Sequence, residues 1–136
     1  MDSILNNDAY LKNALVLAYL GDAVFNLRTR DFLVKSYDYK PNQLNKMANS
    51  IVCAKNQADI MKILKQELNE REQDIAIRAR NTHLNNNKAK NSTIEEYSLA
   101  TQFEAVVGYW YLNNEEEKIN NMFKKYVIEK WRDKWL

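Results

Sequence analysis

Two acidic residues stand alone in apolar stretches of the sequence. Asp22 is the only charged residue within residues 14–25, and Glu104 is the only one within residues 99–112. An isolated carboxylate in apolar surroundings is costly, so it is normally paired with a base, protonated or bound to a metal. Two such acids that lie close together repel each other unless a cation sits between them. Oxygen ligands suit Mg²⁺, which also binds phosphate oxygens and can activate water for phosphodiester cleavage.

The two glycines of the chain lie in the same two stretches. Gly21 precedes Asp22, and Gly108 follows Glu104 by four residues, on the same helix face. Glycine inside a helix costs roughly 0.5–1 kcal/mol relative to alanine, so each glycine should have a packing reason. A close approach of the two helices is the simplest reason, and it would bring the two acids together. The alternative is structural, because a buried acid more often pairs with an arginine or caps a helix than binds a metal.

Helices must position these acids, since the composition favours an all-α fold. The 136 residues include only two glycines and one proline. Apolar residues fall on every face of the two acid-bearing segments, so we expect both helices to be central and buried. The hydrophobic spacing predicts helical segments in one domain that covers residues 1–136. The first segment is expected from about Tyr10 to Lys35, with Gly21 as a point where the helix can bend. The other helical segments are expected from Pro41 to about Ala54, from there to about Leu68, from an Asn69 cap, from a Ser92 or Thr93 cap to about Leu112, and from about Glu115.

Composition and charge restrict the class of protein. Cys53 is the only cysteine, so no internal disulfide can form, and the first residues lack the pattern of a secretory signal. No stretch reaches the roughly 18 apolar residues that a membrane helix needs. We therefore expect a soluble cytoplasmic protein without a membrane partner. The net charge of +2 is too small to indicate nucleic-acid binding, which would need local clustering of basic residues or a dimer.

One segment between the two acids combines basic charge with loop character. Residues 75–94 contain no acidic residue, and residues 81–93 show no apolar periodicity, which predicts an exposed loop. Duplex RNA is recognised mostly by its shape, through the backbone and the 2′-hydroxyls, and a basic loop rich in asparagine suits that task. A solvated loop without a partner is the alternative. The candidate RNA-binding residues are Arg78, Arg80, Asn81, Lys88 and Lys90.

The two acid-bearing segments resemble the ribonuclease III catalytic domain. Its Leu-Gly-Asp-Ala/Ser signature is present as Leu20-Gly21-Asp22-Ala23. Its second motif, Phe-Glu-Ala followed by an apolar pair and glycine, follows in the expected order as residues 103–108. The chain is more similar still to the short bacterial branch known as Mini-ribonuclease III, which has the catalytic domain and no double-stranded-RNA-binding domain. The matches to this branch lie at residues 17–22, 40–42, 54–58, 80–81 and 101–105.

This resemblance implies a ribonuclease III-like helical bundle that forms a homodimer. It implies a Mg²⁺-dependent endoribonuclease, with Mn²⁺ as a substitute cation, that cleaves double-stranded RNA and matures the 23S ribosomal RNA precursor. By the same resemblance, Asp22 and Glu104 are the catalytic and metal-binding residues. The alternatives are a catalytically weak or silent RNA-binding or ribosome-associated module on the same fold, and a helical interaction protein with buried ion pairs. The sequence leaves open the cleavage position, the number of cations and the need for a ribosomal-protein helper.

Two further acids of the larger enzymes are absent from this chain. Full-length ribonuclease III enzymes have a Glu four residues before the signature Asp and an Asp three residues before the motif Glu. Ala18 and Thr101 occupy those places here, as in the Mini branch. The resemblance therefore carries over only Asp22 and Glu104. The loop at residues 85–93 also departs from that branch, with Thr93 where its members commonly have Asp.

Overall fold

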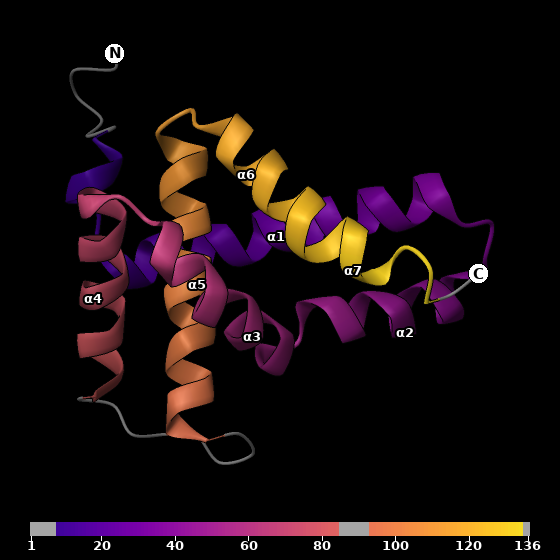
Figure 1. Ribbon diagram of the computed structural model, residues 1–136, viewed down its shortest axis with the longest axis horizontal. Helices are drawn as coiled ribbons and strands as arrows, with labels where there is room; N and C mark the ends of the chain where they lie inside the picture. Colours follow the sequence, from indigo (N-terminus) through magenta and orange to yellow (C-terminus); the bar gives the residue numbers. More distant parts are fainter. Residues whose placement is uncertain (1–7, 85–92, 135–136) are drawn as a thin grey trace.

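The chain forms an all-α bundle, as the composition predicts. The computed structural model describes residues 8–84 and 93–134, and within them there is no strand. Figure 1 shows the arrangement of the helices. They are α1 (Ala14–Ser36), α2 (Pro41–Val52), α3 (Ala54–Leu64), α4 (Glu70–Leu84), α5 (Ile94–Leu112), α6 (Glu116–Phe123) and α7 (Glu129–Trp131), with 3₁₀ turns at Ala9–Leu11 and Lys65–Glu67 and a π-helical segment at Lys124–Ile128.

The predicted helix starts are confirmed where a side chain caps the backbone. Asn69 Oδ1 accepts a hydrogen bond from the backbone N–H of Glu72 at 2.9 Å, and the Glu72 carboxylate accepts one from the Asn69 N–H at 2.8 Å. This reciprocal pair is a capping box and starts α4. Thr93 Oγ1 accepts from the N–H of Glu96 at 3.0 Å and starts α5. Both caps act within four residues, which is why the local sequence reveals them.

Two predicted boundaries differ from the structure. The first long helix begins at Ala14 and not near Tyr10, because Asn13 Oδ1 caps it by accepting from the N–H of Leu15 at 2.8 Å. The loop predicted to begin at Asn81 begins later, since α4 continues to Leu84. Residues 85–92 of that loop lie outside the described residues. Helix α4 therefore extends beyond Arg80, the last residue before the polar segment, because polar residues can continue a helix.

Helix α5 is the central element of the bundle. Helices α1, α3 and α4 all pack against it, and Figure 1 shows α4 alongside it and α1 crossing it. Apolar residues on every face of α5 make this burial favourable, as its sequence predicted. No described helix has the combination of length and hydropathy that a membrane span requires.

The prediction that α1 is buried on every face is wrong. Leu17 and Phe25 are buried against the bundle. The opposite side of the helix exposes Val16 by 54%, Tyr19 by 84% and Leu27 by 69%. These positions recur at helical spacing, so they form one exposed apolar stripe. The apolar residues of α1 thus form two surfaces. One packs in the core, and the other is the exposed stripe.

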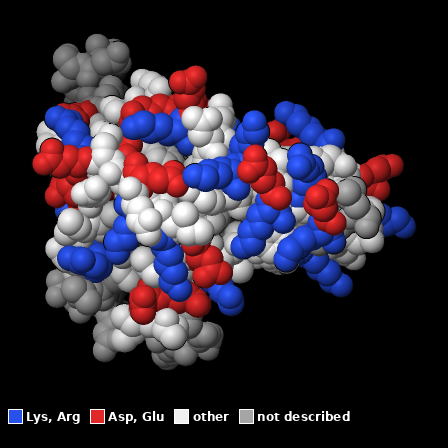
Figure 2. Space-filling view, in the orientation of Figure 1, with Lys and Arg blue, Asp and Glu red and all other residues white. Residues whose placement is uncertain are grey.

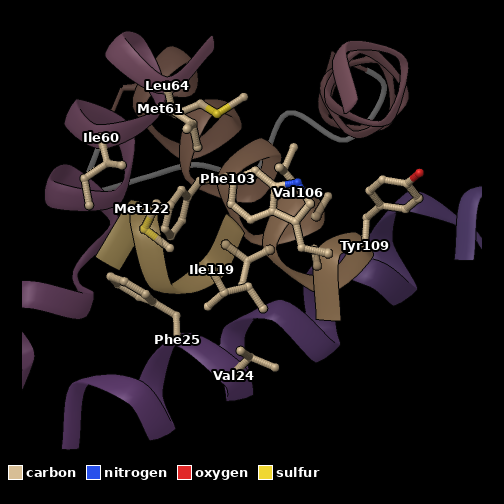
Figure 3. Close-up of a cluster of buried hydrophobic side chains, with 14 of the residues drawn as sticks. Val24, Phe25, Ile60, Met61, Leu64, Phe103, Val106, Tyr109, Ile119 and Met122 are labelled. Atoms are coloured by element: carbon tan, nitrogen blue, oxygen red, sulfur yellow. The ribbon is translucent and has the colours of Figure 1, made fainter. Parts of the chain in front are cut away.

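An aromatic cluster holds α1 against α5. Figure 3 shows Phe25 of α1, Phe103 of α5 and Met122 of α6 in one buried group. The rings of Phe25 and Phe103 pack edge to face with centroids 4.9 Å apart, and Phe123 lies 6.0 Å from Phe25. Complete burial of one such ring stabilises the fold by roughly 1.5–3 kcal/mol. The cluster therefore fixes where α1 crosses α5, which decides the positions of the two acids.

Candidate active site

The site lies where α1 and α5 cross at Gly21 and Gly108. A Cβ atom on Gly21 would lie 1.8 Å from the backbone oxygen of Glu104. A Cβ atom on Gly108 would lie 2.0 Å from the backbone oxygen of Leu17. Neither backbone leaves room for a side chain, so both positions need glycine. The close approach predicted from the two glycines is confirmed, and it places one acid from each helix beside the contact.

Asp22 and Glu104 lie next to each other at this crossing. Asp22 is exposed and Glu104 is partly buried, so the expectation that both acids lie in the core is wrong for Asp22. Burial, a hydrogen bond with the Asp22 carboxyl group and the charge of Asp22 raise the pKa of Glu104 to about 8. Burial is the largest of these causes, because it disfavours the charged form of Glu104, and the neighbouring carboxyl group of Asp22 adds to it. The pair is open to solvent on the Asp22 side.

Each of the two acids has an amide partner that the sequence did not reveal. Asn26 Nδ2, one turn along α1, donates to the backbone oxygen of Asp22 at 2.9 Å and to its Oδ1 at 3.2 Å. Gln57 Nε2, from α3, donates to Glu104 Oε2 at 3.5 Å. Spacing of four residues could have suggested Asn26. Gln57 is 47 residues away in sequence from Glu104, so only the packing of α3 on α5 brings it into the site.

The site offers a cation two protein carboxylates. Among the described residues, no group of three or more His, Cys, Asp and Glu side chains comes together. Ala18 and Thr101, the positions that carry acids in full-length enzymes, are both buried. The Thr101 hydroxyl donates to the Tyr97 backbone oxygen at 3.2 Å, within its own helix. Mg²⁺ bound through two carboxylates normally keeps several water molecules, and substrate phosphate oxygens can complete its ligands.

The predicted RNA-binding residues of α4 fall into two groups. The Arg78 guanidinium donates to the backbone oxygens of Lys12 and Tyr10 at 3.1 and 2.6 Å, and it pairs with Asp74 at 3.2 Å. These contacts attach the segment before α1 to α4, which is a structural role. Arg80 and Asn81 are exposed at the end of α4, where contact with phosphate stays a prediction. Lys88 and Lys90 lie outside the described residues.

Charge on the visible face of the molecule does not single out a binding surface. Figure 2 shows Lys and Arg interspersed with Asp and Glu, with basic side chains more frequent towards the end formed by α2 and α7. A mixed surface agrees with the net charge of +2. The overall field of one chain therefore attracts a polyanion such as RNA only weakly. The positions of individual basic residues should contribute more to RNA binding than the net charge does.

Comparison with known proteins decides the family. A family model described as "Ribonuclease III domain" matches residues 15–115, which include both acids. A Mini-ribonuclease 3 from Brevibacillus brevis is 44% identical over 115 residues, 85% of each chain. One from Staphylococcus aureus is 36% identical over 129 residues, 93% of this chain and 96% of the relative. The chain belongs to the Mini-ribonuclease 3 branch of the ribonuclease III family.

A solved structure gives the same result for the fold. An X-ray crystal structure of a protein from Fusobacterium nucleatum superposes with a TM-score of 0.76 and 35% sequence identity, and the match covers 83% of this chain and 90% of that one. As a member of the ribonuclease III family, the chain is an endoribonuclease. The family acts on double-stranded RNA and uses a divalent metal ion. Asp22 and Glu104, at the α1–α5 crossing, offer oxygen ligands of the kind that such an ion takes.

Proposed function

We propose that this chain is a Mg²⁺-dependent endonuclease of double-stranded RNA, with Asp22 and Glu104 as its catalytic, metal-binding residues. The carboxyl pair at the α1–α5 crossing carries the proposal. In the absence of a cation, burial and the neighbouring Asp22 raise the pKa of Glu104 to about 8, so the pair retains a proton at neutral pH. A divalent cation would take the place of that proton and allow both carboxylates to keep their charge.

The donor set fits a hard cation. Asp22 and Glu104 offer oxygen ligands, which Mg²⁺ prefers, and Mg²⁺ normally keeps several waters when it binds through one or two carboxylates. Mn²⁺ accepts the same ligand type and would substitute. When bound, Mg²⁺ supplies a water of lowered pKa and neutralises charge on the phosphate that is cleaved. The two carboxylates would hold the cation, and the exposed Asp22 leaves their side of the crossing accessible to an RNA backbone.

RNA contact is proposed for the end of α4 and the loop that follows it. Arg80 and Asn81 are exposed there and can reach phosphate or 2′-hydroxyl oxygens. Lys88 and Lys90 are proposed as further contacts on sequence grounds. Because such binding depends on phosphates, duplex affinity should fall steeply as salt concentration rises.

We propose that the exposed stripe of α1 is covered by a second copy of the chain. Val16, Tyr19 and Leu27 are exposed along one side of α1, and Asp22 lies at the edge of this stripe. A homodimer would bury this apolar surface, which is unusual on a monomer. It would also place two acid pairs in one assembly, one for each strand of a duplex.

We further propose that residues 1–136 act as a single catalytic domain in the cytoplasm on the 23S ribosomal RNA precursor. The support is the similarity to relatives named Mini-ribonuclease 3 over most of the chain. The test compares cleavage of a precursor transcript with cleavage of an unrelated duplex of equal length. Defined cuts in the precursor and slow, scattered cuts in the unrelated duplex are expected. Equal cleavage of both would contradict the assignment of this substrate.

The central experiment incubates wild type and Asp22→Asn with a long RNA duplex, with Mg²⁺ and with chelator. Asp31→Asn is the matched control, because it removes the same charge from an exposed position of the same helix. Wild type and Asp31→Asn should cleave only with Mg²⁺, and Asp22→Asn should bind the duplex without cleaving it. Equal cleavage by Asp22→Asn would refute the catalytic role of the acid pair.

A further inference from the structure

Gln57 is a buried amide that reaches the acid pair from a third helix. Its side chain is 2% exposed, and its Nε2 donates to Glu104 Oε2 at 3.5 Å. The surrounding residues of α3, Ala58, Ile60 and Met61, are buried and apolar. An amide in such a place costs free energy unless its polar atoms find partners, so its presence calls for a reason. The hydrogen bond to Glu104 points to that reason.

Neighbouring buried amides behave differently. Asn56 Nδ2 donates to the backbone oxygen of Ile51 at 2.7 Å, which stabilises the turn between α2 and α3. Gln102 Nε2 donates to Ser98 Oγ at 3.0 Å, one turn away on α5. Both amides donate to groups nearby in the sequence, and Asn56 Oδ1 also accepts a hydrogen bond from Lys130 Nζ at 3.0 Å. Gln57 instead donates to a carboxylate of the acid pair, on another helix and 47 residues away in the sequence.

The amide suits a carboxylate that must remain a cation ligand. A lysine or arginine at this place would pair with Glu104 and oppose the binding of a cation, whereas a neutral amide orients the carboxylate without cancelling its charge. Asn26 relates to Asp22 in the same way, since its Nδ2 lies 3.2 Å from Asp22 Oδ1. Each acid of the pair therefore has one neutral donor, and the two donors come from different helices.

We infer that Gln57 is a positioning residue, which holds the Glu104 carboxylate in the orientation that binds a divalent cation together with Asp22. This inference rests on the proposed function, because it assigns the cation site to the same acid pair. Ala18 and Thr101 supply no carboxylate, so orientation of the two remaining acids is a larger part of cation affinity. Hydrogen-bond partners of metal ligands commonly matter to that affinity, and their loss weakens it roughly 10- to 100-fold.

The first experiment replaces Gln57 by methionine, which keeps the volume and removes the donor. Mn²⁺ binding to the RNA-free protein is titrated by electron paramagnetic resonance, with Gln102→Met as the matched control for loss of a buried amide. Gln57→Met should bind Mn²⁺ roughly 10- to 100-fold more weakly than wild type, and Gln102→Met should bind it equally well. The Mg²⁺ concentration for half-maximal duplex cleavage should rise with the Mn²⁺ Kd, and the rate should largely recover at saturating Mg²⁺.

A second variant keeps the inference testable if Gln57→Met folds poorly. Gln57→Glu places a third carboxylate beside Glu104, so Mg²⁺ should raise the Tm of this variant more than it raises that of wild type. A residue without influence on the cation site would give no larger Mg²⁺-dependent rise. That result, or wild-type Mn²⁺ affinity in Gln57→Met, would overturn the positioning role.

The outcomes separate this inference from the proposed function. If wild type cleaves duplex RNA with Mg²⁺, Asp22→Asn does not, and Gln57→Met binds Mn²⁺ like wild type, only the positioning role fails. If Asp22→Asn binds Mn²⁺ and cleaves like wild type, the proposed site itself fails, whatever Gln57→Met does. A loss in Gln102→Met as large as that in Gln57→Met would assign the effect to core packing and also overturn the inference.

Discussion

The Gly21→Ala substitution tests whether backbone contact between α1 and α5 builds the site. The new Cβ atom would meet the backbone oxygen of Glu104 at 1.8 Å and the backbone nitrogen of Gly108 at 2.8 Å. Real Cβ contacts do not fall below 3.0 Å, so the helices must move apart by more than an ångström. Because the obstacle is backbone and not a flexible side chain, no rotamer change can relieve it.

Two opposing effects set the size of the stability change. Overpacking of a well-packed core costs typically 1–3 kcal/mol, and the upper part of that range, about 3 kcal/mol, applies to a clash with backbone. Alanine gains about 0.5–1 kcal/mol over glycine inside a helix. We therefore expect Gly21→Ala to lower the free energy of unfolding by about 2 kcal/mol. A displacement of about 1 Å between Asp22 and Glu104 should also reduce cleavage about 100-fold.

Urea unfolding at one fixed protein concentration measures the stability, and duplex cleavage at saturating Mg²⁺ measures activity in parallel. The matched control is the pair Asp31→Ala and Asp31→Gly, at an exposed position of the same helix. At position 31 alanine should be more stable than glycine by about 0.5–1 kcal/mol, which is the opposite order to position 21. If Gly21→Ala is as stable and as active as wild type, the contact between the two backbones does not determine the site.

Three further predictions follow from the same structure. In chelator, the unfolding free energy should fall as pH rises from about 4.5 to about 8, because the folded protein binds the Glu104 proton more tightly than the unfolded chain does. Glu104→Gln should remove this slope, and an unchanged slope would contradict the assignment. Tyr19→Asp, in the middle of the exposed α1 stripe, should convert dimer to monomer in sedimentation equilibrium, and an intact dimer would exclude that stripe as the interface. Arg80→Met should weaken duplex binding and reduce its salt slope by about 1, whereas Arg78→Met should lower the Tm and leave the salt slope unchanged; the reverse pattern would exchange the roles of the two arginines.

Much of this protein is determined by interactions between residues near each other in the sequence. The caps at Asn69 and Thr93 act within one turn, so they are visible as short motifs. The two acids and the two glycines were also informative by themselves, because an isolated charge or a mid-helix glycine is costly and needs a compensating contact. That contact is the close approach of α1 to α5, which the structure confirms at Gly21 and Gly108.

Tertiary structure alone decided which side of each helix faces solvent and which groups that are distant in sequence come into contact. Periodicity shows that α1 is apolar all round, but it does not distinguish a face packed on α5 from the exposed stripe that includes Tyr19. The contacts of Arg78 with backbone oxygens of the segment before α1 were not visible in the sequence, because these partners are distant in sequence. The contact of Gln57 with Glu104 was not visible in the sequence for the same reason, since the two residues are 47 positions apart. Long-range contacts depend on how helices pack, and apart from the two glycines no local pattern in this sequence indicated that geometry.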